Sequence, residues 1–113
     1  MSTKIFIGFV EGASHHTCNL ASAAWVIYAP IGQLVTSRGT YLGLATNNMA
    51  EYSSVIELLR DVALHGISCL KVRLDSQLVV SHLNGDYEVR HPSLLCQFFR
   101  IRLLARHFDY IIY

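Results

Sequence analysis

The sequence predicts a mixed α/β domain built on a five-stranded sheet that begins with three antiparallel strands. Two observations indicate this fold class: residues 4–42 contain three β-rich apolar runs separated by turn residues, and residues 43–113 alternate between helical and strand-like patterns. The resulting order, β-β-β-α-β-α-α-β, is typical of a sheet with helices packed on both faces. A chain of 113 residues has room for one such domain, so we expect residues 1–113 to form a single unit.

The first three strands are separated by turn residues. An apolar run predicts the first strand over Lys4–Val10, and the turn-like residues Glu11–Ser14 predict its end. A second strand is expected over Ala21–Ala29. Pro30–Gly32 breaks this run, so Leu34–Leu42 should return antiparallel to it as the third strand.

A long helix and a fourth strand follow. Asn47 and Asn48 supply N-cap chemistry for a helix that should run to about His65, with Gly66 as its stop signal. The run Leu70–Leu74 alternates apolar and charged residues, which indicates the fourth strand.

Two helices and a final strand complete the pattern. Asp75 or Ser76 can cap a short helix that extends through Leu83. Pro92 is favoured at the first position of a helix, and this helix is expected to reach about His107. The β-type run Phe108–Tyr113 predicts the fifth strand.

The composition is unusually apolar, with 52% hydrophobic and 15% charged residues, against roughly 25% charged residues in typical domains. This excludes a disordered chain. No apolar run reaches the ~20 residues of a membrane span, so we expect no membrane partner. The three cysteines, Cys18, Cys69 and Cys96, form no closely spaced pair, which indicates a reducing, intracellular compartment.

The net charge of +1 does not by itself indicate a nucleic-acid partner. The region after Tyr87 is locally basic, with the arginines Arg90, Arg100, Arg102 and Arg106. Such a segment either faces a phosphate backbone or forms an ordinary solvated helix face, and charge alone leaves both readings open.

Three carboxylates are predicted at the ends of elements. Glu11 is in phase with the apolar residues of the first strand, Glu51 lies near the start of the long helix, and Asp75 follows the fourth strand. Each has a simple alternative role, as a solvated strand end, a first-turn acid or an N-cap. Brought together they would repel until a divalent cation neutralised them. The other acids of the long helix, Glu57 and Asp61, fall on its polar arc.

Several strings of residues resemble the motifs of ribonuclease H domains. Residues 46–52, TNNMAEY, are similar to the family's helix-start motif, and residues 75–80, DSQLVV, to its aspartate motif, which residues 84–87, NGDY, continue. Residues 11–14, EGAS, resemble the first-strand motif, in which the family has Asp at the first position. The order and spacing agree over nearly the whole chain. The resemblance is to the reverse-transcriptase-like type of plant proteins and retroelements, and it implies a ribonuclease-H-like fold.

The resemblance implies hydrolysis of the RNA strand of RNA/DNA hybrids by two divalent metal ions, usually Mg²⁺, with Mn²⁺ as a possible substitute. Glu11 and Asp75 would bridge the metals and Glu51 would hold one of them. Amide side chains can read a 2′-hydroxyl, the group that separates RNA from DNA. The residues expected to contact the hybrid are Gly12, Ala13, Ser14, Asn47, Asn48, Ser76 and Gln77.

The sequence departs from the family pattern in three ways. Position 11 is Glu instead of Asp. The family's last helix, with its fourth carboxylate, has no counterpart after the fifth strand, so we expect a truncated domain. The loop at residues 15–20 lacks the glycines and prolines usual there.

Three hypotheses follow from these departures. In the first, the chain is a ribonuclease H whose activity is impaired by Glu11 and by the absent last helix. In the second, it is a catalytically dead module that binds nucleic acid or serves in a structural assembly. The third hypothesis is a fragment whose uncovered sheet flank is buried by self-association or by a segment of a parent chain.

Overall fold

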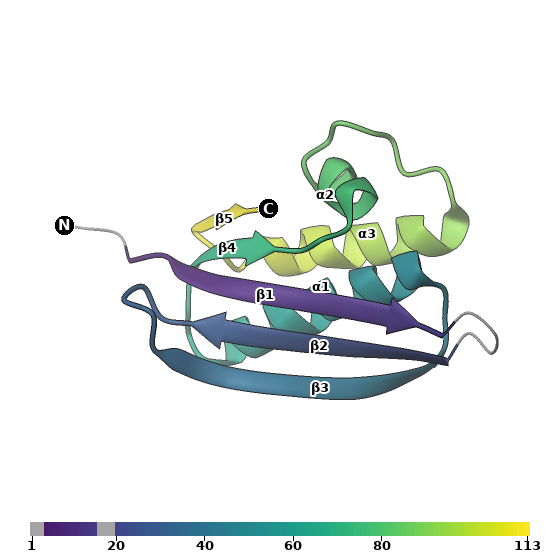
Figure 1. The fold of residues 1–113 in the computed structure, drawn as a ribbon. Helices are drawn as coiled ribbons and strands as arrows, with labels where there is room; N and C mark the ends of the chain where they lie inside the picture. Colours follow the sequence, from purple (N-terminus) through teal and green to yellow (C-terminus); the bar gives the residue numbers. More distant parts are fainter. Residues whose placement is uncertain (1–3, 16–19) are drawn as a thin grey trace.

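The computed structural model describes residues 4–15 and 20–113, and Figure 1 shows their arrangement. Its strands form one five-stranded sheet, as the sequence predicted. The elements, in chain order, are β1 (Phe6–Ser14), β2 (Leu20–Tyr28), β3 (Leu34–Leu44), α1 (Asn47–Leu64), β4 (Cys69–Arg73), α2 (Gln77–Leu83), α3 (Pro92–Ala105) and β5 (Tyr110–Ile112).

The strand order across the sheet is β3-β2-β1-β4-β5. The first three strands form an antiparallel meander, whereas β4 pairs in parallel with both β1 and β5. Parallel neighbours need a crossover connection, which β2, β3 and α1 supply between β1 and β4. Because β1 and β4 run in the same direction, their carboxyl ends lie at the same edge of the sheet.

The predicted end of β1 at Glu11–Ser14 is wrong, since these four residues continue the strand. They pair in register with β2, from Glu11 opposite Ala24 to Ser14 opposite Ala21. The small residues of this segment, Gly12, Ala13 and Ser14, therefore do not form a turn. Gly12 and Ser14 lie where β1 passes the start of α1, and bulky side chains there would hold strand and helix apart.

The cap of α1 differs from the prediction, whereas the cap of α2 is one of the two residues predicted for it. Neither Asn47 nor Asn48 caps α1, because the hydroxyl of Thr46 accepts the N–H of Met49. In α2 the cap is Ser76, whose hydroxyl accepts the N–H of Val79. Capping therefore does not use the carboxylate of Asp75, and the N-cap alternative for that residue is excluded.

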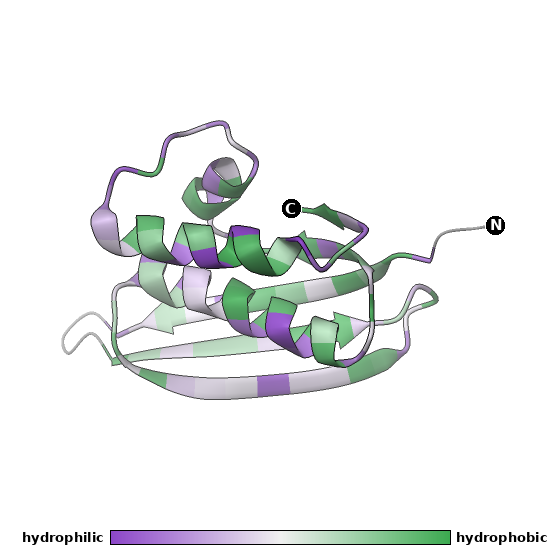
Figure 2. Cartoon of the chain, turned by 180° about the vertical axis from the view of Figure 1, so that it is seen from behind, coloured by the Kyte–Doolittle hydropathy of each residue, from purple (hydrophilic) through white to green (hydrophobic). Residues whose placement is uncertain are grey.

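The main core lies between the sheet and α1. Viewed from behind in Figure 2, α1 and α3 lie side by side on the same face of the sheet. The inward residues of β2, including Trp25 and Ile27, pack against Val55, Leu58 and Leu59 of α1 in one hydrophobic cluster.

The expectation of helices on both faces is wrong for the part of the chain that the structure describes. All three of its helices lie on the α1 side of the sheet, with α2 packed beside α1 (Figures 1 and 2). The opposite face is open, and Phe9 of β1 is 44% exposed there. We call this surface the open face.

No helix within residues 4–15 and 20–113 is long and apolar enough to cross a membrane. Cys69 and Cys96 are free thiols, whereas Cys18 lies outside the described residues. Most of the loop at residues 15–20, whose composition departs from the family pattern, lies outside them as well.

Candidate active site

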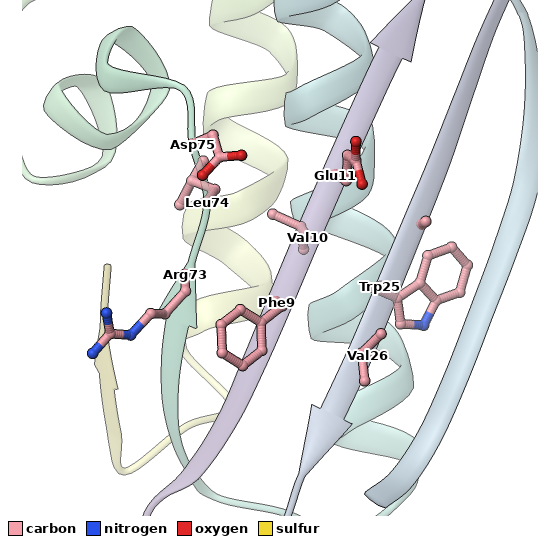
Figure 3. Close-up of a pocket in the computed structure, with 9 residues that line it drawn as sticks. Phe9, Val10, Glu11, Trp25, Val26, Arg73, Leu74 and Asp75 are labelled. Carbon is pink, nitrogen blue, oxygen red and sulfur yellow. The ribbon is translucent and has the colours of Figure 1, made fainter.

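The parallel pairing of β1 and β4 brings two of the predicted carboxylates to one edge of the sheet. Glu11 on β1 and Asp75 just after β4 line the same hollow of about 470 Å³ on the open face, together with Phe9 and Arg73 (Figure 3). Both carboxylates are exposed. Glu11 does continue the side of β1 that carries Phe9, but this side faces outwards.

The third carboxylate, Glu51, lies behind β1 and is 8% exposed. It is the fifth residue of α1 and stands outside the first turn, which contains no acidic residue, so the helix-dipole alternative is excluded. One oxygen, Oε1, accepts the backbone N–H of Gly12 at 2.5 Å. The other, Oε2, is buried and has no hydrogen-bond partner among the described residues.

The surroundings of Glu51 favour its neutral form. Burial raises the pKa of Glu51 above its usual 4.5, the hydrogen bond from Gly12 lowers it, and the negative charges of Asp75 and Glu11 raise it again, with a net increase. The three carboxylates are therefore close enough for their charges to interact. A positive charge placed among them would relieve both the repulsion and the cost of burial.

Close backbone contact holds Glu11 and Glu51 in place. A Cβ atom at Gly12 would lie closer than 3.0 Å to the backbone of Ala50 and to the amide nitrogen of Glu51, so only glycine lets the strand come this near the helix. The hydroxyl of Ser54, one turn further along α1, lies 2.8 Å from the carbonyl oxygen of Ala50 and 3.2 Å from that of Glu11, and it can donate its one proton to either.

The predicted nucleic-acid contacts form two groups, one where β1 meets the start of α1 and one at the start of α2. In the first group, Asn47 Oδ1 accepts the N–H of Ser14 at 2.7 Å, and the Ser14 hydroxyl donates to the carbonyl of Ala45. Asn47 is exposed and Asn48 half-buried. The members of this group are Gly12, Ala13, Ser14, Asn47 and Asn48. The second group is Ser76 and Gln77 at the start of α2.

The donor chemistry fits a hard divalent cation. Carboxylate oxygens are the ligands that Mg²⁺ and Mn²⁺ prefer, and Glu51 Oε2 is a buried acceptor without a partner in the described chain. Within residues 4–15 and 20–113, no three His, Cys, Asp or Glu side chains are grouped so that they could together hold a metal ion. Mg²⁺ does not need such a group, because it is usually held by one or two carboxylates with water and substrate phosphates completing its shell.

Two buried polar contacts were not predicted from the sequence. The hydroxyl of Tyr52 and Nδ1 of His82 lie 2.7 Å apart between α1 and α2. At the other end of α1, the indole N–H of Trp25 donates to Asp61, which is buried and not on the solvated arc of the helix. The sequence feature that marks Tyr52 is its place beside Glu51 in the TNNMAEY string, whereas neither helical phase nor spacing indicates the partner of Asp61.

Comparison with known proteins gives related sequences and structures. Ribonuclease HI of Halobacterium salinarum is 36% identical over 101 residues, covering 89% of this chain and 51% of that protein. This chain thus spans about half the length of that curated relative. The crystal structure of the same archaeon's RNase H1 matches with a TM-score of 0.92 and 34% identity, over 96% of this chain and 83% of that one. LC11-RNase H1, solved in complex with an RNA/DNA hybrid, matches with a TM-score of 0.88 and 26% identity, over 95% and 81% of the two chains.

The mixed five-stranded sheet, its strand order and the match to solved RNase H structures define a ribonuclease-H-like domain. Within that class the chain belongs to the reverse transcriptase-like family, whose model matches residues 9–113. The resemblance inferred from the TNNMAEY and DSQLVV motifs is confirmed.

Proposed function

We propose that this chain hydrolyses the RNA strand of RNA/DNA hybrids with divalent metal ions, Mg²⁺ in the first place and Mn²⁺ as a substitute. The observation that supports this most is the position of Glu51, a buried carboxylate with an unpartnered oxygen that interacts with the charges of Asp75 and Glu11. Uncompensated burial of a charged group is costly, so a site of this kind is typical of cation binding.

Each carboxylate has a distinct task in this proposal. Glu11 and Asp75 line the open hollow and would bridge two metal ions, and Glu51 would hold one of them from behind β1. When bound, the ions would lower the pKa of the attacking water and stabilise the leaving oxygen. The N–H of Gly12 fixes the orientation of Glu51 through Oε1, which leaves Oε2 for the metal.

The exposed polar residues at the site would recognise the hybrid. Because the amide oxygen of Asn47 already accepts from Ser14, its NH₂ group is the part available to donate to a 2′-hydroxyl. Gln77 is exposed at the start of α2 and would contact the strand on the other side of Asp75. A duplex that lacks 2′-hydroxyls should therefore bind more weakly.

Glu11 is expected to reduce the rate. Relative to Asp, its extra methylene moves the carboxylate by about 1.5 Å, whereas sites of this kind need positions held within roughly 0.5 Å. Metal binding would survive such a shift better than the alignment of water and phosphate. The second candidate function, a hybrid-binding module without catalysis, rests on this residue.

The test is hydrolysis of an end-labelled RNA/DNA hybrid in Mg²⁺ and then in Mn²⁺, with Asp75→Asn as the matched inactive control. We expect cleavage of the RNA strand that is lost in Asp75→Asn, and faster cleavage with Glu11→Asp. Cleavage that persists in Asp75→Asn would contradict the assigned site and indicate a contaminating nuclease.

Hybrid binding separates the two candidate functions. Fluorescence anisotropy of a labelled hybrid with the wild-type chain, in both metals, should show binding that a DNA duplex of the same sequence does not match. Binding without cleavage, in wild type and in Glu11→Asp alike, would support the catalytically dead module. Absence of both would exclude both functions for this chain.

A further inference from the structure

A single buried polar contact joins the two helices that carry the catalytic motifs. The hydroxyl of Tyr52 lies 2.7 Å from Nδ1 of His82, and the two rings stack with centroids 6.1 Å apart and planes 27° from parallel. Both side chains are buried, at 0% and 6% exposure. A hydrogen bond and a stacking contact together restrict both the distance and the orientation between the helices.

The position of each partner connects this contact to the carboxylates. Tyr52 directly follows Glu51 in α1. His82 is one residue before the end of α2, the helix that Ser76 caps immediately after Asp75. The hydrogen bond between Tyr52 and His82 thus connects the helix that carries Glu51 to the helix that follows Asp75.

Apart from this contact, α2 is anchored in the main core by Val79, which is fully buried. The short helix spans Gln77–Leu83, and a helix of two turns has no stability of its own in water. It touches α1 far less than β1, β2 or α3 do. A phenol and an imidazole buried in apolar surroundings must satisfy one another, because either alone would lose its hydrogen bonds to water. Apolar side chains of similar size would fill this space without defining one geometry.

We propose that Tyr52 and His82 are positioning residues that hold α2, and with it Asp75, at a fixed place relative to Glu51. The catalytic half of this inference rests on the proposed function, whereas the structural half, the tethering of α2, does not. Neither residue touches the hollow that Glu11 and Asp75 line.

The catalytic half is tested by the kinetics of hybrid hydrolysis. Tyr52→Phe and His82→Leu should lower kcat by about ten- to a hundredfold with little change in KM, since a displacement near 1 Å can cost about a hundredfold. His82→Asn should recover most of the rate, because its side-chain amide can place either Oδ1 or Nδ2 where Nδ1 lies and so pair with the Tyr52 hydroxyl as acceptor or donor. Tyr41→Phe, on a tyrosine that is 67% exposed, is the matched control and should leave kcat unchanged.

The structural half is tested by amide hydrogen exchange of the full chain, without substrate. In Tyr52→Phe and His82→Leu the amides of residues 77–83 should exchange about tenfold faster, while those of Val55–Leu59 in α1 keep their protection. Equally faster amide exchange in both helices, or unchanged exchange in α2, would contradict the proposal that the two residues hold α2 in place.

The two readouts distinguish the possible failures. Faster amide exchange confined to α2, together with an unchanged kcat, would overturn the positioning role, because catalysis would then not depend on how firmly α2 is held. If the wild-type chain does not cleave hybrids at all, the proposed function fails and exchange alone decides whether the pair holds α2. A drop in kcat that His82→Asn does not reverse would also contradict the role assigned to the hydrogen bond.

Discussion

Glu51 is the residue at which burial and charge conflict most strongly. Its raised pKa means that the fold prefers the neutral acid. The stabilising effect of the neutral form is fully present below the unfolded pKa of 4.5 and is lost as the pH rises through the higher folded pKa. Above the folded pKa, the chain without metal therefore carries a destabilising carboxylate, which a cation would compensate.

Replacing Glu51 with Gln should remove the destabilising charge at this position. Without metal, Glu51→Gln is expected to unfold at a higher temperature than wild type at pH 7, and the difference should shrink towards pH 4, because wild type then becomes neutral at this position. Thermal unfolding followed by circular dichroism at several pH values measures this. Mg²⁺ should stabilise wild type and not the variant. Glu57→Gln, on a half-buried acid of the same helix, is the control, and equal behaviour of the two variants would contradict the prediction.

Gly12 is the residue that allows strand and helix to meet. Gly12→Ala should destabilise the fold by about 3 kcal/mol or more, because its Cβ would overlap backbone atoms that cannot rotate away. Urea unfolding measures the loss. Gly39→Ala is the control, since a Cβ there meets its nearest backbone atom at an ordinary 3.5 Å. A Gly12→Ala chain as stable as Gly39→Ala would refute the close contact.

At the residue scale, sequence reasoning succeeded where a pattern carried the information. Helical phase placed Glu51 at the border of the core, and the structure buries it. The same phase put Asp61 on the solvated arc, yet its carboxylate accepts the indole N–H of Trp25 at 2.8 Å. A hydrogen-bond donor on another element can stabilise an acid in a buried position. The periodicity of a single helix gives no information about such a donor.

At the scale of elements, Asp61 joins β2, β3 and α1. Besides the indole of Trp25, Asp61 lies 3.5 Å from Nε of Arg38 on β3, and its carboxylate is 3.4 Å from His65 at the end of the helix. The arrangement fixes the end of α1 opposite to the end that carries Glu51. The exposed Arg38 contributes little to stability by itself, whereas the buried indole bond contributes more.

The contact between Trp25 and Asp61 should therefore show measurable coupling. In a double-mutant cycle of Trp25→Phe with Asp61→Ala, we expect a coupling energy of about 1 to 3 kcal/mol, typical of a buried hydrogen bond to a charged group. Urea unfolding must be followed by circular dichroism, since Trp25 is the chain's one tryptophan and its removal eliminates the intrinsic fluorescence signal. Additive losses would contradict the contact.

Most elements could be predicted because their signals are local. Turn residues, alternation and the stop at Gly66, which has φ of +73°, identified the order of strands and helices. The continuation of β1 through Glu11–Ser14 could not be predicted, because its cause is the pairing with β2 and the approach of α1. Three residues in this segment are small or turn-forming types, and tertiary contacts decided their conformation.

At the scale of the whole molecule, α1 connects every part of the core. Its buried face contacts β1, β2 and α3, so loss of packing in α1 should weaken the entire fold. Leu58 is fully buried there and presses against Gly8 of β1. The chain is thus expected to unfold in one cooperative transition.

Leu58→Ala tests this cooperativity. We expect a loss of about 2 to 5 kcal/mol, enough to lower the Tm by roughly 10 °C or more. Circular dichroism and Trp25 fluorescence should give coincident transitions. Leu64→Ala makes the same chemical change in the same helix at a side chain that is 86% exposed, and should have little effect. Separate transitions for the two probes would contradict a single core.

The parallel pairing of β1 with β4 also determines when the carboxylates meet. Phe6 is opposite Leu70, so the pair closes only after β2, β3 and α1 have been made. Pairings between such distant segments form slowly compared with local ones. A chain still emerging from the ribosome contains Glu11 and Glu51 well before Asp75 can join them. The proposed centre is thus incomplete until Asp75 has been synthesised and β4 has paired with β1.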